Sequence, residues 1–366
     1  MTNVHKRTGS KTKAAKAAMA QLQSTTDRYV IGDKLGHGAY GIVREAVDAK
    51  NNDTPVAIKT ITLTKNNEDT VRIVREIKLL NYLSHPNIIK MTDMILTPTN
   101  GNVVSLVFEK MDMDMHCMIR ENDDLSWMHH MAFMLQILRG IEYMHGCDII
   151  HRDLKPKNIL INENCQVKIA DFGLSRPLST DNFDAPWSDY VASRWYRPPE
   201  LCGSFFKRYS KPIDMWAIGC IFGEMILRAP VFPGNDTVDQ LEKIMSILGK
   251  PTDVFINRIE NRKARDFFKR AAPCDPRPFC EVFPNATPDE LFVLENLLKY
   301  DPLERMTAAQ LLDQPMFKKW EKTAFDKDSD ATAKRSIIEK EFKDLDAFDR
   351  PRLINEIYHE SMKLQS

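Results

Sequence analysis

No apolar run in this sequence is long enough to cross a membrane. A membrane-spanning helix needs roughly 18 or more apolar residues in a row, and the 366-residue chain has no such run. The amino-terminal stretch is basic but has no hydrophobic core, so it does not fit a secretory signal. We therefore expect a protein without a membrane partner, located in the cytoplasm, the nucleus or both.

Net charge is also absent, because 51 basic residues balance 51 acidic residues. A balanced chain has no global field that would demand a nucleic-acid partner, and none is expected. The seven cysteines stand singly from Cys117 to Cys280 and form no CxxC pair. This spacing argues against a zinc ribbon and a disulfide framework, and it favours a reducing compartment.

The length exceeds what one ordinary hydrophobic core serves, so two lobes are predicted. Residues 1–28 are predicted to be a basic, disordered segment, with a nuclear address or an amphipathic helix as the alternatives. Its cations, which meet no carboxylate in the first 26 residues, are Lys6, Arg7, Lys11, Lys13 and Lys16. We expect the whole chain to be a monomer.

Secondary-structure patterns differ between the two halves of the ordered chain. Residues 29–61 show short β-rich segments, a helix is predicted over 69–83, and strands are predicted over 90–96 and 103–108. From residue 111 onward the pattern is helical. We predict an α+β chain with a β-rich N-lobe carrying one helix (29–110), a helical C-lobe (111–317) and a C-terminal extension (318–366) that packs on the surface.

A glycine-rich loop stands near the start of the N-lobe. Its sequence Gly36-His37-Gly38-Ala39-Tyr40-Gly41-Ile42-Val43 follows the pattern GxGxxGxV. Glycines let the backbone approach a triphosphate with its amides directed at the oxygens. Because the strand-like Val43-Arg44-Glu45-Ala46-Val47 follows, and not a helix, the pattern favours a hairpin over a nucleotide more than a dinucleotide-binding turn.

A lysine and a glutamate are predicted to form a pair. Alternation in Val56-Ala57-Ile58-Lys59 places Ala57 and Lys59 on one face of a strand. Glu76 lies on the apolar face of the predicted helix, where an unpaired carboxylate would cost several kcal/mol. Lys59 would relieve that cost and remain directed at phosphates; the alternative for Lys59 is an exposed strand residue.

The densest motif is His151-Arg152-Asp153-Leu154-Lys155-Pro156-Lys157-Asn158, followed by Asp171-Phe172-Gly173. Phosphoryl transfer needs a group that accepts or orients the attacking hydroxyl, and Asp153 fits this role. Asn158 and Asp171 offer the oxygen ligands that Mg²⁺ prefers. Lys155 can neutralise charge on the transferred group. Catalysis is thus assigned to Asp153, Lys155, Lys59 and Glu76.

From residue 29 to about 317 these motifs resemble the eukaryotic protein kinase family. The resemblance implies the bilobal protein kinase fold, with ATP and Mg²⁺ in the cleft. It assigns the gatekeeper to Phe108, hinge contacts to Glu109 and Met111, and the ribose contact to Asp114. It also implies that Asp214 braces the catalytic loop and that Glu200 pairs with Arg305. The residues implied to enclose adenine are Leu35, Val43, Ala57 and Leu160.

Three segments resemble mitogen-activated protein kinases of the extracellular signal-regulated type. These are residues 190–197, an insert near 250–285, and the tail 345–357, which the resemblance implies folds back on the N-lobe. Arg194 matches the arginine that favours substrates with proline after the phosphoacceptor. Phe108 also resembles the gatekeeper of cyclin-dependent kinases, which leaves that group as the alternative.

The resemblance further implies a phosphorylation switch in a signalling cascade. Ser188-Asp189-Tyr190 stands where these kinases usually carry Thr-x-Tyr, so Ser188 and Tyr190 are the expected sites, modified by an upstream kinase or by autophosphorylation. Pro198 replaces the usual alanine before Pro199-Glu200, which we expect to be tolerated. The arginines that meet the two phosphates in relatives, and that we expect to lack other partners here, are Arg75, Arg152, Arg176, Arg194 and Arg197.

Asp326, Asp328 and Asp330 form an acidic patch that resembles the docking region for basic partner peptides; the alternative is a solvated charge run.

Two other classes of protein compete with the kinase hypothesis. A scaffold without catalysis would have lost Lys59, Asp153, Asn158 or Asp171, and all four are present. A metabolic kinase would not need the segment 188–197.

Overall fold

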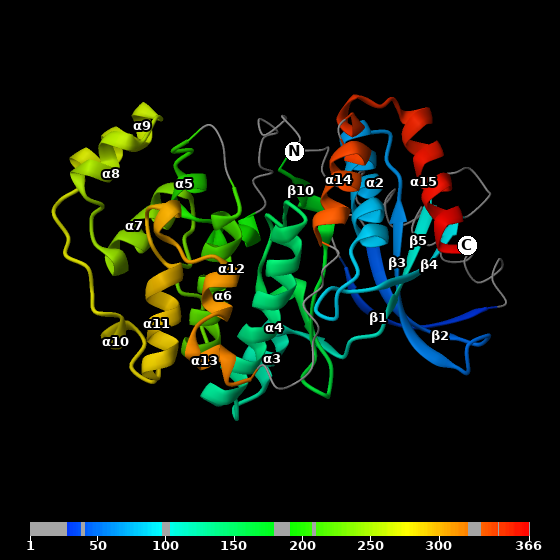
Figure 1. Cartoon of the computed structure of the whole chain (residues 1–366), viewed down its shortest axis with the longest axis horizontal. Helices are drawn as coiled ribbons and strands as arrows, with labels where there is room; N and C mark the ends of the chain where they lie inside the picture. Colours follow the sequence, from blue (N-terminus) through cyan, green and yellow to red (C-terminus); the bar gives the residue numbers. More distant parts are fainter. Residues whose placement is uncertain are drawn as a thin grey trace, which may run out of the picture. The chain divides into compact units, whose positions relative to one another are not determined.

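The computed structural model describes residues 28–37, 41–96, 103–178, 191–206, 210–320, 331–342 and 344–365, with only the backbone at 191–193, 331–333 and 365. Figure 1 shows its helices and strands in sequence colours. Several predicted features lie outside the described residues. They are the segment 1–27, the loop residues Gly38, Ala39 and Tyr40, the residues Ser188 and Tyr190, and the patch Asp326, Asp328 and Asp330.

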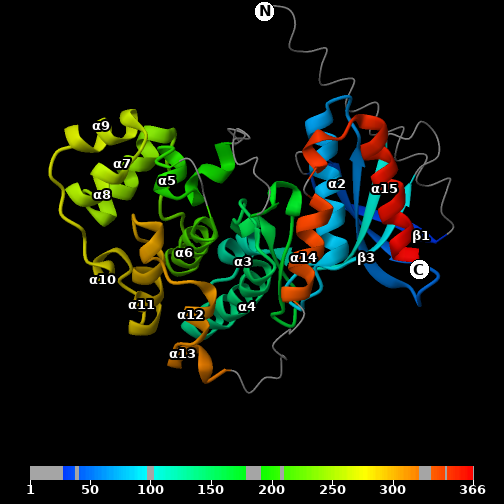
Figure 2. The ribbon, with the colours of Figure 1, turned by 45° about the horizontal axis from the view of Figure 1, so that its top comes forward.

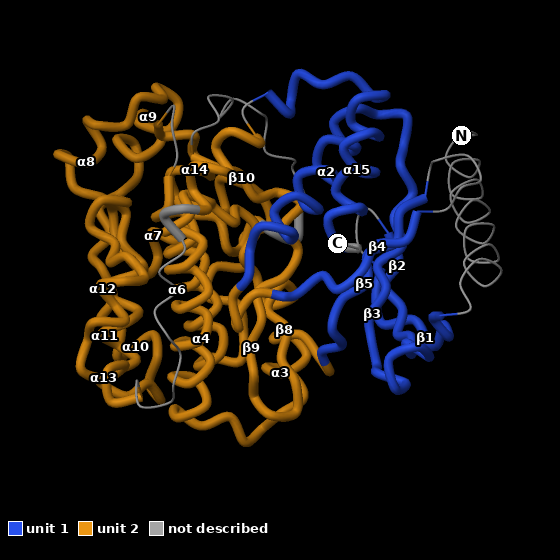
Figure 3. Tube along the Cα trace, turned by 45° about the vertical axis from the view of Figure 1, so that its right-hand side comes forward, with its two compact units in different colours: residues 1–84, 89–111, 344–366 blue, residues 85–88, 112–343 orange. Residues whose placement is uncertain are grey.

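The chain divides into two compact units, coloured separately in Figure 3. Unit 1 comprises residues 1–84, 89–111 and 344–366, and unit 2 comprises residues 85–88 and 112–343. No helix among the described residues is both long and apolar enough to span a membrane.

Unit 1 is built on an antiparallel five-stranded sheet in the order β1-β2-β3-β5-β4. Alternation along the strands divides its two faces, because Val56 and Ile58 are buried together with Val107 while Ala57 and Lys59 point to the other face. The strands are β1 (Tyr29–His37), β2 (Gly41–Asp48), β3 (Thr54–Thr62), β4 (Met91–Leu96) and β5 (Val103–Glu109).

One long helix, α2 (Asn67–Tyr82), follows β3. Asn66 caps it by accepting a hydrogen bond from the backbone nitrogen of Glu68, and Glu68 and Asp69 suit the positive end of the helix dipole. The helix predicted over 69–83 is therefore confirmed. The C-terminal elements η5 (Leu345–Ala347) and α15 (Arg350–Gln365) also belong to unit 1, and α15 packs on α2 and β4.

Unit 2 is mainly helical and has two short sheets, β6-β8-β9 and β7-β10. Its central helix α6 (Pro212–Leu227) is buried from Ile213 to Met225 and is apolar on all sides, as a core helix requires. Proline at its first position suits a helix start. The longer helix α4 (Trp127–Gly146) packs on α6 and on β9.

The remaining elements of unit 2 cover this core. The strands are β6 (Met113–Asp114), β7 (Ile149–Ile150), β8 (Ile159–Ile161), β9 (Val167–Ile169) and β10 (Arg176–Pro177). The α-helices are α3 (Met115–Glu121), α5 (Pro199–Cys202), α7 (Thr237–Leu248), α8 (Asp253–Arg258), α9 (Arg262–Arg270), α10 (Phe279–Val282), α11 (Pro288–Leu297), α12 (Ala308–Leu312), α13 (Pro315–Lys318) and α14 (Ala331–Phe342). Short 3₁₀ turns are η1 (Pro156–Asn158), η2 (Phe172–Leu174), η3 (Val191–Tyr196) and η4 (Pro302–Glu304).

The C-terminal extension is divided between the units, and the tail 345–357 belongs to unit 1, as the resemblance implied. Helix α14 packs on α4 and β10 of unit 2, and only residues from 344 onward join unit 1. The physical reason is that α14 buries Ile338 and Phe342 before the chain reaches unit 1, where Leu345, Leu353 and Ile357 are buried in turn.

Candidate active site

The predicted pair between β3 and α2 is present. The Nζ atom of Lys59 lies 2.6 Å from Oε1 of Glu76. The side chains are 14% and 4% exposed, so the glutamate has exchanged water for the ammonium group. Register pairing places Val43 of β2 beside Lys59 on one side and Leu106 of β5 on the other. Lys59 is thus held at a fixed point on the face of β3 opposite the buried cluster.

The glycines of the loop differ in their surroundings. A Cβ atom at Gly41 would overlap the carbonyl oxygen of Thr60, because β2 and β3 run close together at this point. A Cβ atom at Gly36 would meet nothing within 4 Å. Packing therefore requires glycine at position 41 but not at position 36.

The gatekeeper Phe108 and the first hinge residue Glu109, as the resemblance assigns them, are the last two residues of β5. Phe108 is 8% exposed and pairs in register with Ala57. Oε1 of Glu109 accepts a hydrogen bond of 2.9 Å from the backbone nitrogen of Lys90. Met111 is buried just beyond the strand, whereas Leu35 of β1 is 47% exposed.

In unit 2, the catalytic loop draws three predicted residues together. Nζ of Lys155 donates a hydrogen bond of 2.6 Å to Oδ2 of Asp153. Nδ2 of Asn158 donates to the carbonyl oxygen of Asp153 at 2.8 Å and to its Oδ2 at 3.2 Å. Asp153 and Asn158 are 8% and 6% exposed. Because the amide nitrogen of Asn158 is used in this way, its Oδ1 atom is the one presented for a cation.

Asp214 of α6 braces this loop, as predicted. Its Oδ2 accepts a hydrogen bond of 2.9 Å from the backbone nitrogen of His151, and its Oδ1 accepts one of 2.9 Å from that of Arg152. Arg152 has a left-handed backbone with φ of 72°. A non-glycine residue reaches this conformation only where the surroundings hold it, and the two bonds to Asp214 do so.

The sequence analysis missed His145, at the end of α4. Its Nε2 atom lies 3.0 Å from Oδ2 of Asp214, and both residues are buried. Burial raises the pKa of Asp214, but the hydrogen bond with His145, the nearby His151 and the backbone N–H of Arg152 together hold it below its ordinary value of 3.8. No local pattern marks His145, since it precedes Asp214 by 69 positions.

Asp171 also has a left-handed backbone, with φ of 66°. The next side chain, Phe172, is fully buried, and its ring centroid lies 5.3 Å from that of His151. Burial of Phe172 thus holds Asp171, which is exposed, in the turn beside the catalytic loop.

Asp114, to which the resemblance assigns the ribose contact, caps α3. Its side chain accepts a hydrogen bond of 2.9 Å from the backbone nitrogen of Cys117, and the residue pairs in register with Leu160.

The predicted pair of Glu200 and Arg305 forms two parallel hydrogen bonds, of 2.6 and 2.7 Å.

The expectation that the five arginines assigned to the two phosphates lack other partners is wrong. Arg75 pairs with Asp346, with Nη2 2.5 Å from Oδ1. Nη1 of Arg176 donates to the carbonyl oxygen of Ser175 at 2.9 Å, and Nη1 of Arg194 donates to that of Asn235 at 2.7 Å. Arg152 and Arg197 have partners as well.

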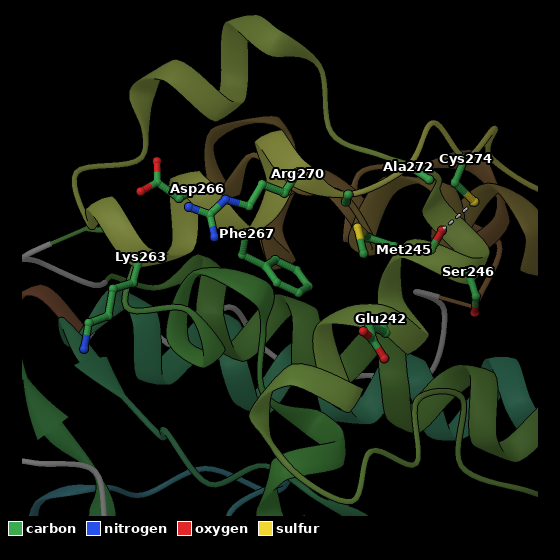
Figure 4. A pocket seen from close by; sticks show the side chains of 10 residues that line it. Glu242, Met245, Ser246, Lys263, Asp266, Phe267, Arg270, Ala272 and Cys274 are labelled. Atoms are coloured by element: carbon green, nitrogen blue, oxygen red, sulfur yellow. Dashed lines mark hydrogen bonds between the residues drawn. The ribbon is translucent and has the colours of Figure 1, made fainter.

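A hollow of about 810 Å³ lies in the predicted insert region, between α7 and α9 (Figure 4). Met245 and Phe267 contribute apolar lining, and Lys263, Asp266 and Arg270 contribute charges of both signs. None of the residues assigned to ATP, Mg²⁺ or catalysis lines it.

Comparisons with known proteins identify the family of the chain. A family model described as "Protein kinase domain" matches residues 29–317. Mitogen-activated protein kinase 8 of Oryza sativa subsp. japonica is 46% identical over 296 residues, which cover 80% of this chain and 52% of that protein. Mitogen-activated protein kinase 17 of Arabidopsis thaliana is 44% identical over 294 residues, which cover 79% of this chain and 60% of that protein.

The chain thus spans between half and two thirds of the length of these relatives. It belongs to the protein kinase family and, within that family, to the mitogen-activated group of serine/threonine kinases. The similarity to these relatives favours the mitogen-activated group over the cyclin-dependent group, which the gatekeeper Phe108 had left as the alternative.

Proposed function

We propose that this chain transfers the γ-phosphoryl group of ATP to serine or threonine hydroxyls of proteins in a signalling cascade. The cluster of Asp153, Lys155 and Asn158 carries the proposal. Asp153 has one carboxylate oxygen engaged by Lys155 and Asn158 and is held in place by them. In the proposed reaction Asp153 accepts the proton of the attacking hydroxyl, and Lys155 neutralises charge on the phosphoryl group.

The donor set fits magnesium. The amide oxygen of Asn158 and the carboxylate of Asp171 are the hard ligands that Mg²⁺ prefers, and no thiolate or imidazole is assigned to the set. Asn158 and Asp171 would hold Mg²⁺, which would offset the negative charge of the phosphates. The left-handed backbone of Asp171 is the observation that supports its role, because such strain concentrates at functional sites.

For ATP itself, we propose that Lys59 binds phosphate oxygens and that Glu76 holds Lys59 for this purpose. The loop residues Gly36, His37, Gly38, Ala39, Tyr40 and Gly41 would cover the phosphates. We propose that Glu109 and Met111 contact adenine through their backbone, with Phe108 as gatekeeper and Asp114 at the ribose. The apolar contacts to adenine are proposed for Leu35, Val43, Ala57 and Leu160.

Asp171→Asn tests the proposal. It removes a magnesium carboxylate, and we expect turnover to fall by a factor of about 10² or more while the fold survives. Asp123→Asn, at an exposed turn of unit 2, is the matched control and leaves turnover unchanged. Near-normal phosphotransfer by Asp171→Asn with MgATP would contradict the assignment. No phosphotransfer by the wild-type chain after phosphorylation of Ser188 and Tyr190 would favour the scaffold alternative.

We further propose that the substrates carry proline after the phosphoacceptor. The support is the match of Arg194, which lies in η3 and donates a hydrogen bond to the carbonyl oxygen of Asn235. A peptide array measures this preference. Equal phosphorylation of peptides with alanine in place of the proline would overturn it.

Activation is proposed to follow phosphorylation of Ser188 and Tyr190, by an upstream kinase or in an autocatalytic step. Arg75, Arg152 and Arg176 are proposed for the first phosphate, and Arg194 and Arg197 for the second. Since Arg75 is paired with Asp346, phosphate binding there exchanges one anion for another. The test compares turnover of unmodified, singly and doubly phosphorylated protein at saturating ATP, and equal rates would refute it.

Docking of basic partner peptides is proposed for Asp326, Asp328 and Asp330. Exposed ion pairs contribute only about 0–1 kcal/mol each, so the three carboxylates would act together. Binding of a Lys/Arg-rich peptide should weaken in the triple Asp→Ala variant and at high salt. Binding that changes in neither experiment would identify the patch as a solvated charge run. The proposed location of the chain is the cytoplasm or nucleus.

A further inference from the structure

Charged side chains tie the C-terminal segment of unit 1 to α2. Helix α15 runs alongside α2, as Figure 2 shows. Lys78 of α2 is 2% exposed, and its Nζ atom lies 2.6 Å from Oε2 of Glu356 and 3.5 Å from Oε1 of Glu360. Two carboxylates of α15 therefore neutralise a buried cation of α2.

Glu360 is the centre of this cluster and is 0% exposed. Its Oε2 atom accepts a hydrogen bond of 2.8 Å from Nδ2 of Asn81, and its Oε1 atom accepts one of 2.8 Å from Nζ of Lys363. Lys363 in turn donates to the hydroxyl of Tyr82 at 3.1 Å. A buried carboxylate is stable only when its oxygens are paired in this way. Glu360 therefore connects Lys78 and Asn81 of α2 to α15 directly, and Tyr82 through Lys363.

A second contact lies nearer the N-terminus of the same helix. Arg75, which is 2% exposed, pairs with Asp346 of η5. With 3.6 residues per turn, Lys78 lies about 200° around the helix from Glu76. Glu76 thus meets Lys59 on one side of α2, while the C-terminal segment holds the other side.

We infer that Glu360 is a positioning residue for phosphoryl transfer, which keeps α2 at the position where Glu76 reaches Lys59. The inference rests on the proposed role of Lys59 in binding ATP phosphates. A helix moves as a unit, so loss of the contacts at Lys78 and Asn81 displaces Glu76 as well. A displacement of about 1 Å at a reacting group can reduce a rate by as much as 10²-fold.

Glu360→Gln tests the inference, because it removes the charge and keeps the size. We expect kcat to fall about tenfold or more, with little change in KM for the peptide substrate. A second readout is the rate at which sulfosuccinimidyl acetate acetylates Lys59, followed by peptide mass spectrometry. Pairing with Glu76 favours the unreactive ammonium form, so we expect Lys59 to react faster in Glu360→Gln than in the wild type.

Glu339→Gln is the control, since Glu339 is an exposed glutamate of α14; it should change neither readout. Asn81→Ala removes hydrogen bonds to Glu360 and leaves its ion pair with Lys78 in place, so it serves if Glu360→Gln does not fold, and we expect the same direction of both effects. A lower melting temperature with unchanged kcat and unchanged Lys59 acetylation would overturn the inference. If the wild-type chain phosphorylated at Ser188 and Tyr190 transfers no phosphate, the proposed function fails, and Lys59 acetylation still tests the position of α2.

Discussion

Arg305 and Glu200 form a two-fold hydrogen-bonded ion pair inside unit 2, and their side chains are 0% and 1% exposed. The guanidinium group also lies 5.0 Å from the ring centre of Trp216. We expect Arg305→Ala to lower the free energy of unfolding by about 3–5 kcal/mol, because it leaves a buried carboxylate without its partner. Denaturant unfolding measures this loss.

A double variant separates the charge from the packing at this site. In Arg305→Met/Glu200→Leu no unpaired charge remains, so the loss of stability should be smaller than in Arg305→Ala. An Arg305→Ala protein as stable as the wild type would show that the pair contributes nothing to the fold.

Asp214 is predicted to act on the rate through the catalytic loop. Asp214→Asn replaces a charged acceptor of two backbone hydrogen bonds by a neutral amide. We expect kcat to fall by about tenfold or more, since Asp153 is then less well positioned. The circular dichroism spectrum should stay native. Turnover equal to that of the wild type would show that His151 and Arg152 hold the loop without Asp214.

Glu224 is predicted to make stability depend on pH. Burial raises its pKa above 4.5, and the hydrogen bond that Tyr196 donates at 2.7 Å only partly opposes this. A carboxyl group whose pKa is raised on folding contributes stability that is fully present below its unfolded value and is lost as pH rises through its folded value. As pH rises above about 4.5, the melting temperature of the wild type should therefore fall relative to that of Glu224→Gln.

Melting curves of both proteins from acidic to neutral pH check this sign. Glu295→Gln is the control, because Glu295 is an exposed glutamate of α11. A difference in melting temperature between wild type and Glu224→Gln that stays constant with pH would contradict the prediction.

The two described glycines of the loop should respond differently to alanine. Gly41→Ala forces a Cβ atom onto the carbonyl oxygen of Thr60, and overpacking of this kind costs about 1–3 kcal/mol. Gly36→Ala meets open space, so the free energy of unfolding should change by no more than about 0.5 kcal/mol. If the loop covers ATP phosphates, Gly36→Ala should still raise KM for ATP. Equal stability of the two variants would show that β2 and β3 can move apart.

The sequence alone predicted the pair of Lys59 and Glu76 because its cause is local. Helical spacing placed a carboxylate on an apolar face, an unpaired charge there is too costly, and alternation along β3 turned a lysine to the right side. The prediction is confirmed by the 2.6 Å contact. The helix 69–83 and the strands of unit 1 were predictable for the same reason, since periodicity and caps act over a few residues.

Tertiary structure alone decided the contacts that join distant segments. Arg75 meets Asp346 across 271 positions, and His145 meets Asp214 across 69 positions. An arginine or histidine pairs with any carboxylate that packing brings near, and local patterns do not say which one this will be. The division of the C-terminal extension has the same origin. Its apolar residues indicated a packed segment, but only the folded surfaces determined that α14 covers unit 2 and α15 covers α2.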